Sequence, residues 1–406
     1  METLHQILRE NLDGLSSFGR EASGGVSRLL YDENWVKAQM HLKDTFEKAG
    51  LAAYFDEVGN LFGRLEGENP NETILSGSHV DTVVQGGTLD GQLGIIAGFV
   101  AIDYLNKTYG KPKRNLEVVA IAEEEGSRFS CTYWGSRNIV GTVTEEEIGN
   151  IADGEGIPFV KAMKEAGFGF KESTTRTDFK GFVELHIEQG IVLEREQKAL
   201  GVVTAIAGQY RYTVKLSGEA NHAGTTPMSL RKDAVHCFSK ICYEATEKAK
   251  VAGDPLVVTF GRVVPEPNVV NVVAGDLLFT IDCRHTDEEE LKVFTEEMEA
   301  DMERTAAEMG LAIDIDPWMK VPPVPMDDGL VAMIEAQCKE AGLNYKMMPS
   351  GAGHDAQVLA KAMPCAMIFV PSIAGISHNP AEVTHLDDLV EGTKALIAAL
   401  YELAYQ

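Results

Sequence analysis

Two periodicities of apolar and polar residues divide the chain into predicted helices and strands. Helical spacing occurs at residues 32–49, 91–105 and 328–341 and in a last segment that begins at Leu386. Short apolar runs that predict strands occur at residues 51–57, 60–65, 73–78, 116–122, 181–188, 202–207 and 366–370. This alternation of helices and strands predicts an α/β layer, in which polar residues at the carboxyl ends of strands form the site.

The segment between residues 209 and 319 has a different order. Strict alternation predicts a first strand, and the pattern continues strand-helix-strand-strand-helix-strand at 210–217, 230–252, 256–264, 277–284, 287–309 and 311–316. That order is typical of a ferredoxin-like unit. Residues 317–325 contain four prolines and predict a hinge-like connector, after which the α/β pattern resumes. We therefore expect a discontinuous α/β domain, residues 1–208 and 320–406, with a ferredoxin-like domain of residues 209–319 inserted into it.

The composition limits the classes of function. A chain of 406 residues is too long for one ordinary hydrophobic core, and its net charge of −26 disfavours nucleic acid and anionic membranes as partners. No apolar run approaches the ~18 residues of a membrane span. The first 15 residues are amphipathic and acidic, unlike a signal peptide, and the six cysteines show no paired spacing. We expect a cytoplasmic protein with reduced thiols.

The segment 77–91 concentrates candidate chemistry. His79 and Asp81 are two residues apart at the end of a predicted strand, a spacing that points both side chains the same way. His79 could then bind a metal while Asp81 accepts its other ring N–H and fixes the imidazole tautomer. Asp90 follows a glycine-rich loop that can bring its carboxylate to the same point. Taken alone, the segment is equally compatible with a surface turn that carries a capping aspartate.

More polar residues occupy predicted strand ends or glycine-containing loops: Glu124, Glu125, His186, His354, Asp355 and His378. Each alone has a structural interpretation, since a single histidine is usually a packing or surface residue and the acids at 123–125 could be a solvated charge run. Their shared position at strand ends favours a mixed histidine and carboxylate site for Zn²⁺ or Mn²⁺. In the Glu124–Glu125 pair, one carboxylate could bind metal while its neighbour acts as general base for an activated water.

These residues, together with an inserted ferredoxin-like domain, resemble the di-metal aminoacylase/carboxypeptidase-type amidohydrolases. Four strings resemble the branch of N-carbamoyl amino acid hydrolases and allantoate amidohydrolases, namely residues 125–129, 184–190, 221–227 and 350–355. Three further strings, 122–129, 201–214 and 375–382, resemble the allantoate-hydrolysing members of that branch most. The resemblance covers essentially the whole chain. It implies hydrolysis of a ureido C–N bond in a small anionic ureide, with allantoate expected as the substrate and two divalent ions, Mn²⁺ or Zn²⁺, in each chain.

The resemblance also implies roles for individual metal-site residues. Asp90 would bridge the two ions. The remaining ligands would be His79 and His186 for one ion, and Glu125 and His378 for the other. Glu124 would act as the base, with Asp81 as a further member of the catalytic group.

The same resemblance implies a substrate-binding set. It comprises Gln189, Gln209, His222, Asn271 and Arg284. His222 would stabilise the oxyanion from the partner subunit of a homodimer, with the inserted domain as its lid and dimerisation surface. Arg284 would hold a carboxylate, because its planar fork matches one bidentately.

Several of these residues have competing structural interpretations. Arg284 could simply pair with Asp282 or Asp287, His222 could be an inert loop residue, and Asn271 could be a turn residue. His354 and Asp355 could form a hydrogen-bonded pair that shapes a loop, and we do not assign them to metal. We interpret His236 and His285 as structural.

Three alternatives to allantoate hydrolysis remain open from the sequence. An N-carbamoyl-L-amino acid or β-ureidopropionate could be the substrate of the same chemistry. A protein that kept the fold without the metals would be a non-catalytic binding protein, although every expected ligand and Glu124 are present. A peptidase of the same fold is disfavoured by the strings at 184–190 and 350–355.

Overall fold

A computed structural model describes residues 3–170 and 176–406 of the chain. The first two residues of the amphipathic segment predicted at the amino terminus lie outside this range. The chain forms two compact units, one of Met1–Thr204 with Met326–Gln406 and one of Ala205–Pro325. The second unit is therefore an insertion in the sequence of the first.

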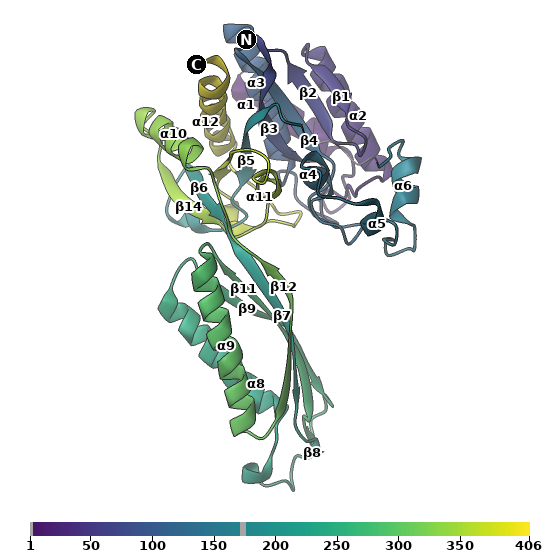
Figure 1. The fold of residues 1–406 in the computed structure, drawn as a ribbon, viewed down its shortest axis with the longest axis vertical. Helices are drawn as coiled ribbons and strands as arrows, with labels where there is room; N and C mark the ends of the chain where they lie inside the picture. The colour runs from purple at the N-terminus through teal and green to yellow at the C-terminus, as the bar shows by residue number, and fades with distance from the viewer. Residues whose placement is uncertain (1–2, 171–175) are drawn as a thin grey trace. The chain divides into compact units, whose positions relative to one another are not determined.

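The first unit is built on one mixed sheet (Figure 1). In the described chain the strand order is β1-β2-β4-β3-β5-β15-β6-β13, and β14 also pairs with β6. Their bounds are β1 Ala52–Phe55, β2 Leu61–Leu65, β3 Asn69–His79, β4 Arg114–Ile121, β5 Phe179–Ile187, β6 Leu200–Ile206, β13 Val324–Pro325, β14 Tyr345–Ser350 and β15 Cys365–Val370. The central strands β4, β3, β5 and β15 are mutually parallel. Their carboxyl ends therefore meet at one edge of the sheet.

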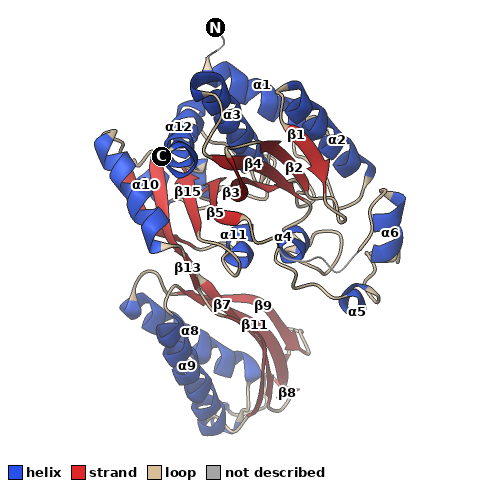
Figure 2. Ribbon diagram, turned by 45° about the horizontal axis from the view of Figure 1, so that its top comes forward, coloured by secondary structure: helices blue, strands red, loops and turns tan. Residues whose placement is uncertain are grey.

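Helices cover this sheet (Figure 2). They are α1 Leu4–Ser16, α2 Glu33–Lys48, α3 Gln92–Tyr109, α4 Trp134–Ile139, α5 Glu145–Ile148, α6 Phe159–Glu165, α7 Val192–Arg195, α10 Asp328–Glu340, α11 Asp355–Leu359 and α12 Leu386–Tyr405, with a 3₁₀ turn η2 at Ile373–Gly375. Helix α3 is apolar on nearly every side and is buried from Gln92 to Ile102 against β3, β5 and α12. This first part of the helix has no solvent face, so its amino terminus beside Asp90 is held by packing.

The second unit has a separate sheet and core. The order of its elements is β7 Gly208–Ser217, β8 Asn221–His222, η1 Met228–Leu230, α8 Ala234–Ala252, β9 Val257–Glu266, β10 Val272–Val273, β11 Asp276–His285, α9 Glu288–Glu308 and β12 Ala312–Val321. In this part of the described chain, the antiparallel sheet has the order β12-β7-β11-β9, and β8 pairs with β10 in a short ribbon. Alternate residues such as Tyr212 and Ile281 pack in the core with α8 and α9. The opposite face carries polar side chains.

The long periodic segments are confirmed as elements, one prediction needs correction, and one strand was missed. The proline-containing segment predicted as a connector at 317–325 continues the strand β12 to Val321, with an irregular register between Asp316 and Met319. Pro317 lies in that irregularity, where a missing N–H breaks no ladder hydrogen bond. Strand β14, which contains Tyr345 to Ser350, has little apolar alternation and was not predicted.

Among the helices within residues 3–170 and 176–406, none combines the length and the apolar character that crossing a bilayer requires.

Candidate metal centre

Polar side chains gather where the parallel strands of the first unit end. His79 is the last residue of β3, Glu124 and Glu125 follow β4, and His186 lies one residue before the end of β5. His378 follows β15 and the η2 turn. His79 and His378 are 299 positions apart in the sequence. They lie at the same edge of the sheet because its central strands are parallel.

The carboxylate of Asp90 lies at the centre of this group. Its Oδ1 is 3.3 Å from Nε2 of His79 and 3.3 Å from Nε2 of His186. Its Oδ2 is 3.2 Å from Nε2 of His378, and that same nitrogen is 3.2 Å from Oε1 of Glu125. One oxygen of Asp90 therefore faces a pair of histidines, and the other faces a histidine and a carboxylate.

The two sides of Asp90 form two overlapping groups of ligand atoms. One group is Asp90 with His79 and His186, and the second is Asp90 with Glu125 and His378; in each, the ligand atoms lie within 4.8 Å of one another. A third group of the same compactness joins His79 to Glu124 and Glu125. Imidazole nitrogens and carboxylate oxygens are the donors that Zn²⁺ and Mn²⁺ take in proteins, so this donor set fits two divalent cations.

Burial and charge have opposite effects on Asp90. Burial alone would raise its pKa, but the imidazoles of His186, His378 and His79 hold the pKa of Asp90 well below its usual range. Hydrogen bonds to Asp90 and Glu125 raise the pKa of His378 to about 10. The carboxylates thus create a field that stabilises positive charge at the positions of the three imidazoles. A divalent cation would be stabilised by the same field.

Asp81 holds both the histidine and the acidic loop. Its Oδ1 is 3.3 Å from Nδ1 of His79, the ring nitrogen that faces away from Asp90. The two carboxylate oxygens also accept backbone N–H groups of Glu124, at 3.0 Å, and of Glu125, at 3.2 Å. A single side chain therefore orients one imidazole and the backbone that presents two carboxylates.

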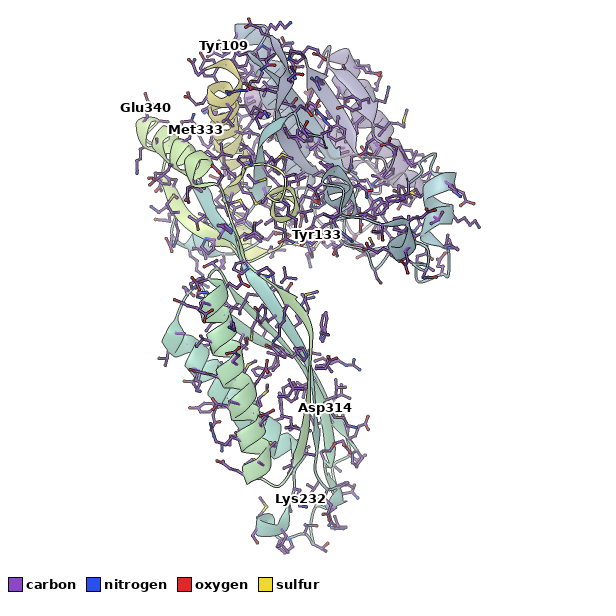
Figure 3. All side chains as sticks on the ribbon, in the orientation of Figure 1. Tyr109, Tyr133, Lys232, Asp314, Met333 and Glu340 are labelled. Carbon is purple, nitrogen blue, oxygen red and sulfur yellow. The ribbon has the colours of Figure 1, made fainter. Side chains whose placement is uncertain are left out.

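Glu124 lies beside the proposed ligands without bonding to Asp90. Burial raises the pKa of the Glu124 carboxyl well above its ordinary value, and the positive charge of His79 opposes this while Glu125, Asp355 and Asp81 add to it. The hydroxyl of Tyr133, a residue labelled in Figure 3, interacts with Glu124, and the Tyr133 backbone N–H donates to the Glu124 carbonyl at 3.0 Å. A carboxylate with a raised pKa is a better proton acceptor near neutral pH, which is what a general base requires.

The backbone around the centre has unusual conformations. Gly91 has a φ of +68°, and a Cβ there would lie 2.4 Å from the carbonyl oxygen of His79, so only glycine allows the α3 amino terminus to approach so closely. Gln189 and His378 adopt φ values of 57° and 54°. Such values are uncommon for residues other than glycine, and the surrounding structure must hold them in place.

The structure adds residues that the sequence did not single out. Oε1 of Glu382 accepts the backbone N–H groups of Leu89, at 2.9 Å, and of Asp90, at 3.1 Å. The Ser377 hydroxyl lies 2.9 Å from both Asp90 Oδ2 and Glu382 Oε2. Both residues are in the string 375–382 beside His378, and a search of that string for hydrogen-bonding groups could have found them.

Two residues near the centre, Gln189 and His354, make contacts that the sequence did not predict. Gln189, expected to contact substrate, donates from Nε2 to Asp90 Oδ2 at 2.8 Å, so its amide is part of the Asp90 environment. The Nε2 atom of His354 lies 3.0 Å from the Ser350 hydroxyl, and His354 also groups with Glu184 and His186. The possible pairing of His354 with Asp355 is thus replaced by a contact with Ser350.

The other expected substrate residues belong to the second unit. Gln209 and Arg284 are register partners on β7 and β11, and Asp282 accepts from both. The pairing of Arg284 with Asp282 that we had weighed as an alternative is therefore present. His222 lies on β8. The next residue, Ala223, donates its backbone N–H to the carbonyl of Asn271 at 3.0 Å. His285 has a local role, because its Nδ1 accepts the N–H of Asp287 at 2.9 Å.

We predict that Asp81→Asn weakens metal binding about 10-fold to 100-fold. The carboxylate of Asp81 accepts from two backbone N–H groups and faces His79, whereas an amide has only one acceptor oxygen. Its N–H₂ group would therefore face either a backbone N–H of the Glu124–Glu125 segment or His79. Competition with a chromophoric chelator measures the change. Asp44→Asn, which removes an exposed carboxylate that pairs with Lys48 on α2, is the matched control. Equal affinities in the two variants would contradict the role given to Asp81.

Comparison with known proteins places this geometry in a family. The profile of the peptidase family M20/M25/M40 matches residues 75–402. The chain is 55% identical to the allantoate amidohydrolase of Escherichia coli (strain K12) over 404 residues, which cover 99% of this chain and 98% of that protein. It is 45% identical to the allantoate amidohydrolase of Bacillus subtilis (strain 168), covering 98% and 97% of the two chains.

A solved structure agrees with this placement. The crystal structure of an amidase of the hydantoinase/carbamoylase family from Burkholderia multivorans superimposes with a TM-score of 0.94 and 31% identity, over 99% of this chain and 98% of that one. The fold, the arrangement of the candidate ligands and the sequence all agree with membership of one family. The chain belongs to the peptidase family M20/M25/M40.

Proposed function

We propose that the chain hydrolyses a ureido C–N bond of allantoate with two divalent cations, Mn²⁺ or Zn²⁺, bound on the two sides of Asp90. The observation that carries the proposal is the division of that carboxylate, with Oδ1 facing His79 and His186 and Oδ2 facing His378, which contacts Glu125. The relatives named allantoate amidohydrolase, similar over nearly their whole length, support the choice of substrate.

The cations, when bound, would supply Lewis-acid polarisation of the ureido carbonyl and acidify a water molecule. Polarisation matters because a urea carbon is a poor electrophile. The protein supplies the proton acceptor: Glu124 takes the proton of the attacking water and delivers it to the departing nitrogen. Cleavage followed by loss of the carbamoyl carbon gives ureidoglycine, ammonia and carbon dioxide.

His222 is suited to stabilise the oxyanion of the tetrahedral carbon. Its Nδ1 accepts the backbone N–H groups of Gly224, at 3.0 Å, and of Thr225, at 3.2 Å. With Nδ1 acting as acceptor, the proton of the neutral ring is on Nε2, which becomes a hydrogen-bond donor on an exposed side chain.

The remaining substrate contacts would come from four side chains: Gln189, Gln209, Asn271 and Arg284. Arg284 would hold the allantoate carboxylate, because a guanidinium fork matches a carboxylate. Such a cation is needed locally, since the chain as a whole carries a net charge of −26.

We propose that the second unit is a ferredoxin-like lid and dimerisation domain. Its β-α-β-β-α-β order of main elements and its sheet order β12-β7-β11-β9 support the name. Gln209 and Arg284 lie at one end of the β7–β11 pair, whereas the β8–β10 ribbon with His222 follows the Ser217–Asp276 end (Figure 1).

That separation supports a homodimer. Eight residues of strand from Gln209 to Ser217 span about 26 Å, which is longer than an allantoate molecule. The two sets of side chains in one unit therefore cannot hold the same substrate. A second copy of the chain would supply His222 and Asn271 to a substrate bound by Gln209 and Arg284.

Two alternatives are kept for the test. N-carbamoyl-L-amino acids and β-ureidopropionate offer the same reacting group without the second ureido group. A metal-free binding protein of the same fold would bind the ureide without turnover.

We expect the protein to act in the cytoplasm.

We predict that protein loaded with Mn²⁺ or Zn²⁺ releases ammonia from allantoate with a kcat/KM at least about 10-fold above that for N-carbamoyl-L-alanine or β-ureidopropionate, because only allantoate has a second ureido group to hold. A coupled ammonia assay measures all three. Glu124→Gln is expected to keep its metal content and lose about 10²-fold to 10⁴-fold in kcat. Equal turnover by Glu124→Gln, or no ammonia from allantoate under either cation, would contradict the proposal.

We predict that two inactive variants, Glu124→Gln and His222→Ala, complement one another when their subunits are exchanged. A random mixture has half of its molecules as heterodimers, each with one intact site, so activity should return to about a quarter of that of the native enzyme. Subunit exchange is followed by native mass spectrometry and activity by ammonia release. If heterodimers form and activity stays at the level of the separate variants, His222 acts within its own chain.

A further inference from the structure

Asp282 connects the side chains on the polar face of the second unit. Its Oδ2 accepts from Nε2 of Gln209 at 2.7 Å and from Nε of Arg211 at 2.9 Å. Its Oδ1 accepts from Nε of Arg284 at 2.9 Å. No role follows for Asp282 from the metal centre or from the family motifs.

Strand register explains why these groups meet. Asp282 is the partner of Arg211, and Arg284 is the partner of Gln209, in the antiparallel pair of β7 and β11. Residues two apart on a strand, and directly opposite residues on its neighbour, share one face. The intervening Tyr210 and Cys283 are buried in the core, which fixes the four polar side chains on the opposite face.

The charges keep Asp282 ionised. Partial burial favours its neutral form, but the guanidinium groups of Arg284 and Arg211 outweigh this and hold the pKa of Asp282 below its ordinary value. An ionised carboxylate has acceptor atoms only. The group that Gln209 turns toward Asp282 must therefore be its N–H₂, and the carbonyl oxygen of the planar amide lies on the other side.

We propose that Asp282 is a positioning residue that fixes the amide of Gln209 with its Oε1 as the acceptor for an N–H of the second ureido group of the substrate. This rests on the proposed function. A fixed acceptor favours a ureido group, which offers N–H donors, and disfavours a carboxylate or carbonyl at the same position. Asp282 would thereby contribute to the choice of allantoate over substrates with one ureido group.

The test separates binding of the second ureido group from general damage. In Asp282→Asn, the new N–H₂ group can donate to Gln209, so the Gln209 amide can turn and present N–H₂ in place of Oε1. We expect KM for allantoate to rise about 10-fold to 100-fold. The competitive Ki of N-carbamoylglycine, which is allantoate without its second ureido group, should change by less than about 3-fold.

Further variants keep the inference falsifiable. Gln209→Met retains the length of the side chain without its hydrogen-bonding groups and should reproduce the rise in KM even if Asp282→Asn folds poorly. In the Gln209→Met background, adding Asp282→Asn should change KM by less than about 3-fold, because the positioned group is already gone. Asp276→Asn, on the same face of β11 and hydrogen-bonded to Ser217, is the matched control with unchanged kinetics.

Two outcomes would overturn the inference. One is an equal rise in the KM of allantoate and the Ki of N-carbamoylglycine in Asp282→Asn, which indicates that Asp282 acts through Arg284 or through the fold and not through Gln209. The second is an effect of Asp282→Asn that persists in full in the Gln209→Met background. Failure of the proposed function is distinct, because the native enzyme itself would then release no ammonia from allantoate.

Discussion

The arrangement depends on one buried carboxylate that is shared between two sets of ligands. Asp90 can face both sets because it lies at the glycine-flanked start of a helix that is buried nearly all round. Its neighbours come from the ends of three parallel strands and from the loop after a fourth. Burying several carboxylates together is unfavourable unless positive charge compensates them. A pair of divalent cations would provide that compensation.

Carboxylates that accept hydrogen bonds maintain the geometry in both units. Asp81 accepts two backbone N–H groups of the acidic loop, and Glu382 accepts those of Leu89 and Asp90. Asp282 has the same kind of role toward side chains on β7 and β11. In each case a carboxylate acceptor holds its donors in one orientation, which is how a site can be ordered before its ligand arrives.

Sequence reasoning reached the elements and most of the centre because both follow from local rules. Continuous apolar runs predict interior parallel strands, and residues such as His79 and His186 stand at the ends of such runs. The contacts of Gln189, Ser377 and Glu382 were beyond it, since each depends on how a loop folds over Asp90. The strand continuing past Pro317 was missed because a bulge accommodates the proline. Asp282 could be weighed only as a partner of Arg284, because its contact with Gln209 depends on the register between β7 and β11.

Anomalous diffraction from crystals grown with Mn²⁺ or Zn²⁺ tests the central claim most directly. The account predicts two peaks per chain, one between Asp90, His79 and His186 and one between Asp90, Glu125 and His378. A single peak, peaks away from Asp90, or two ions that do not share this carboxylate would contradict it.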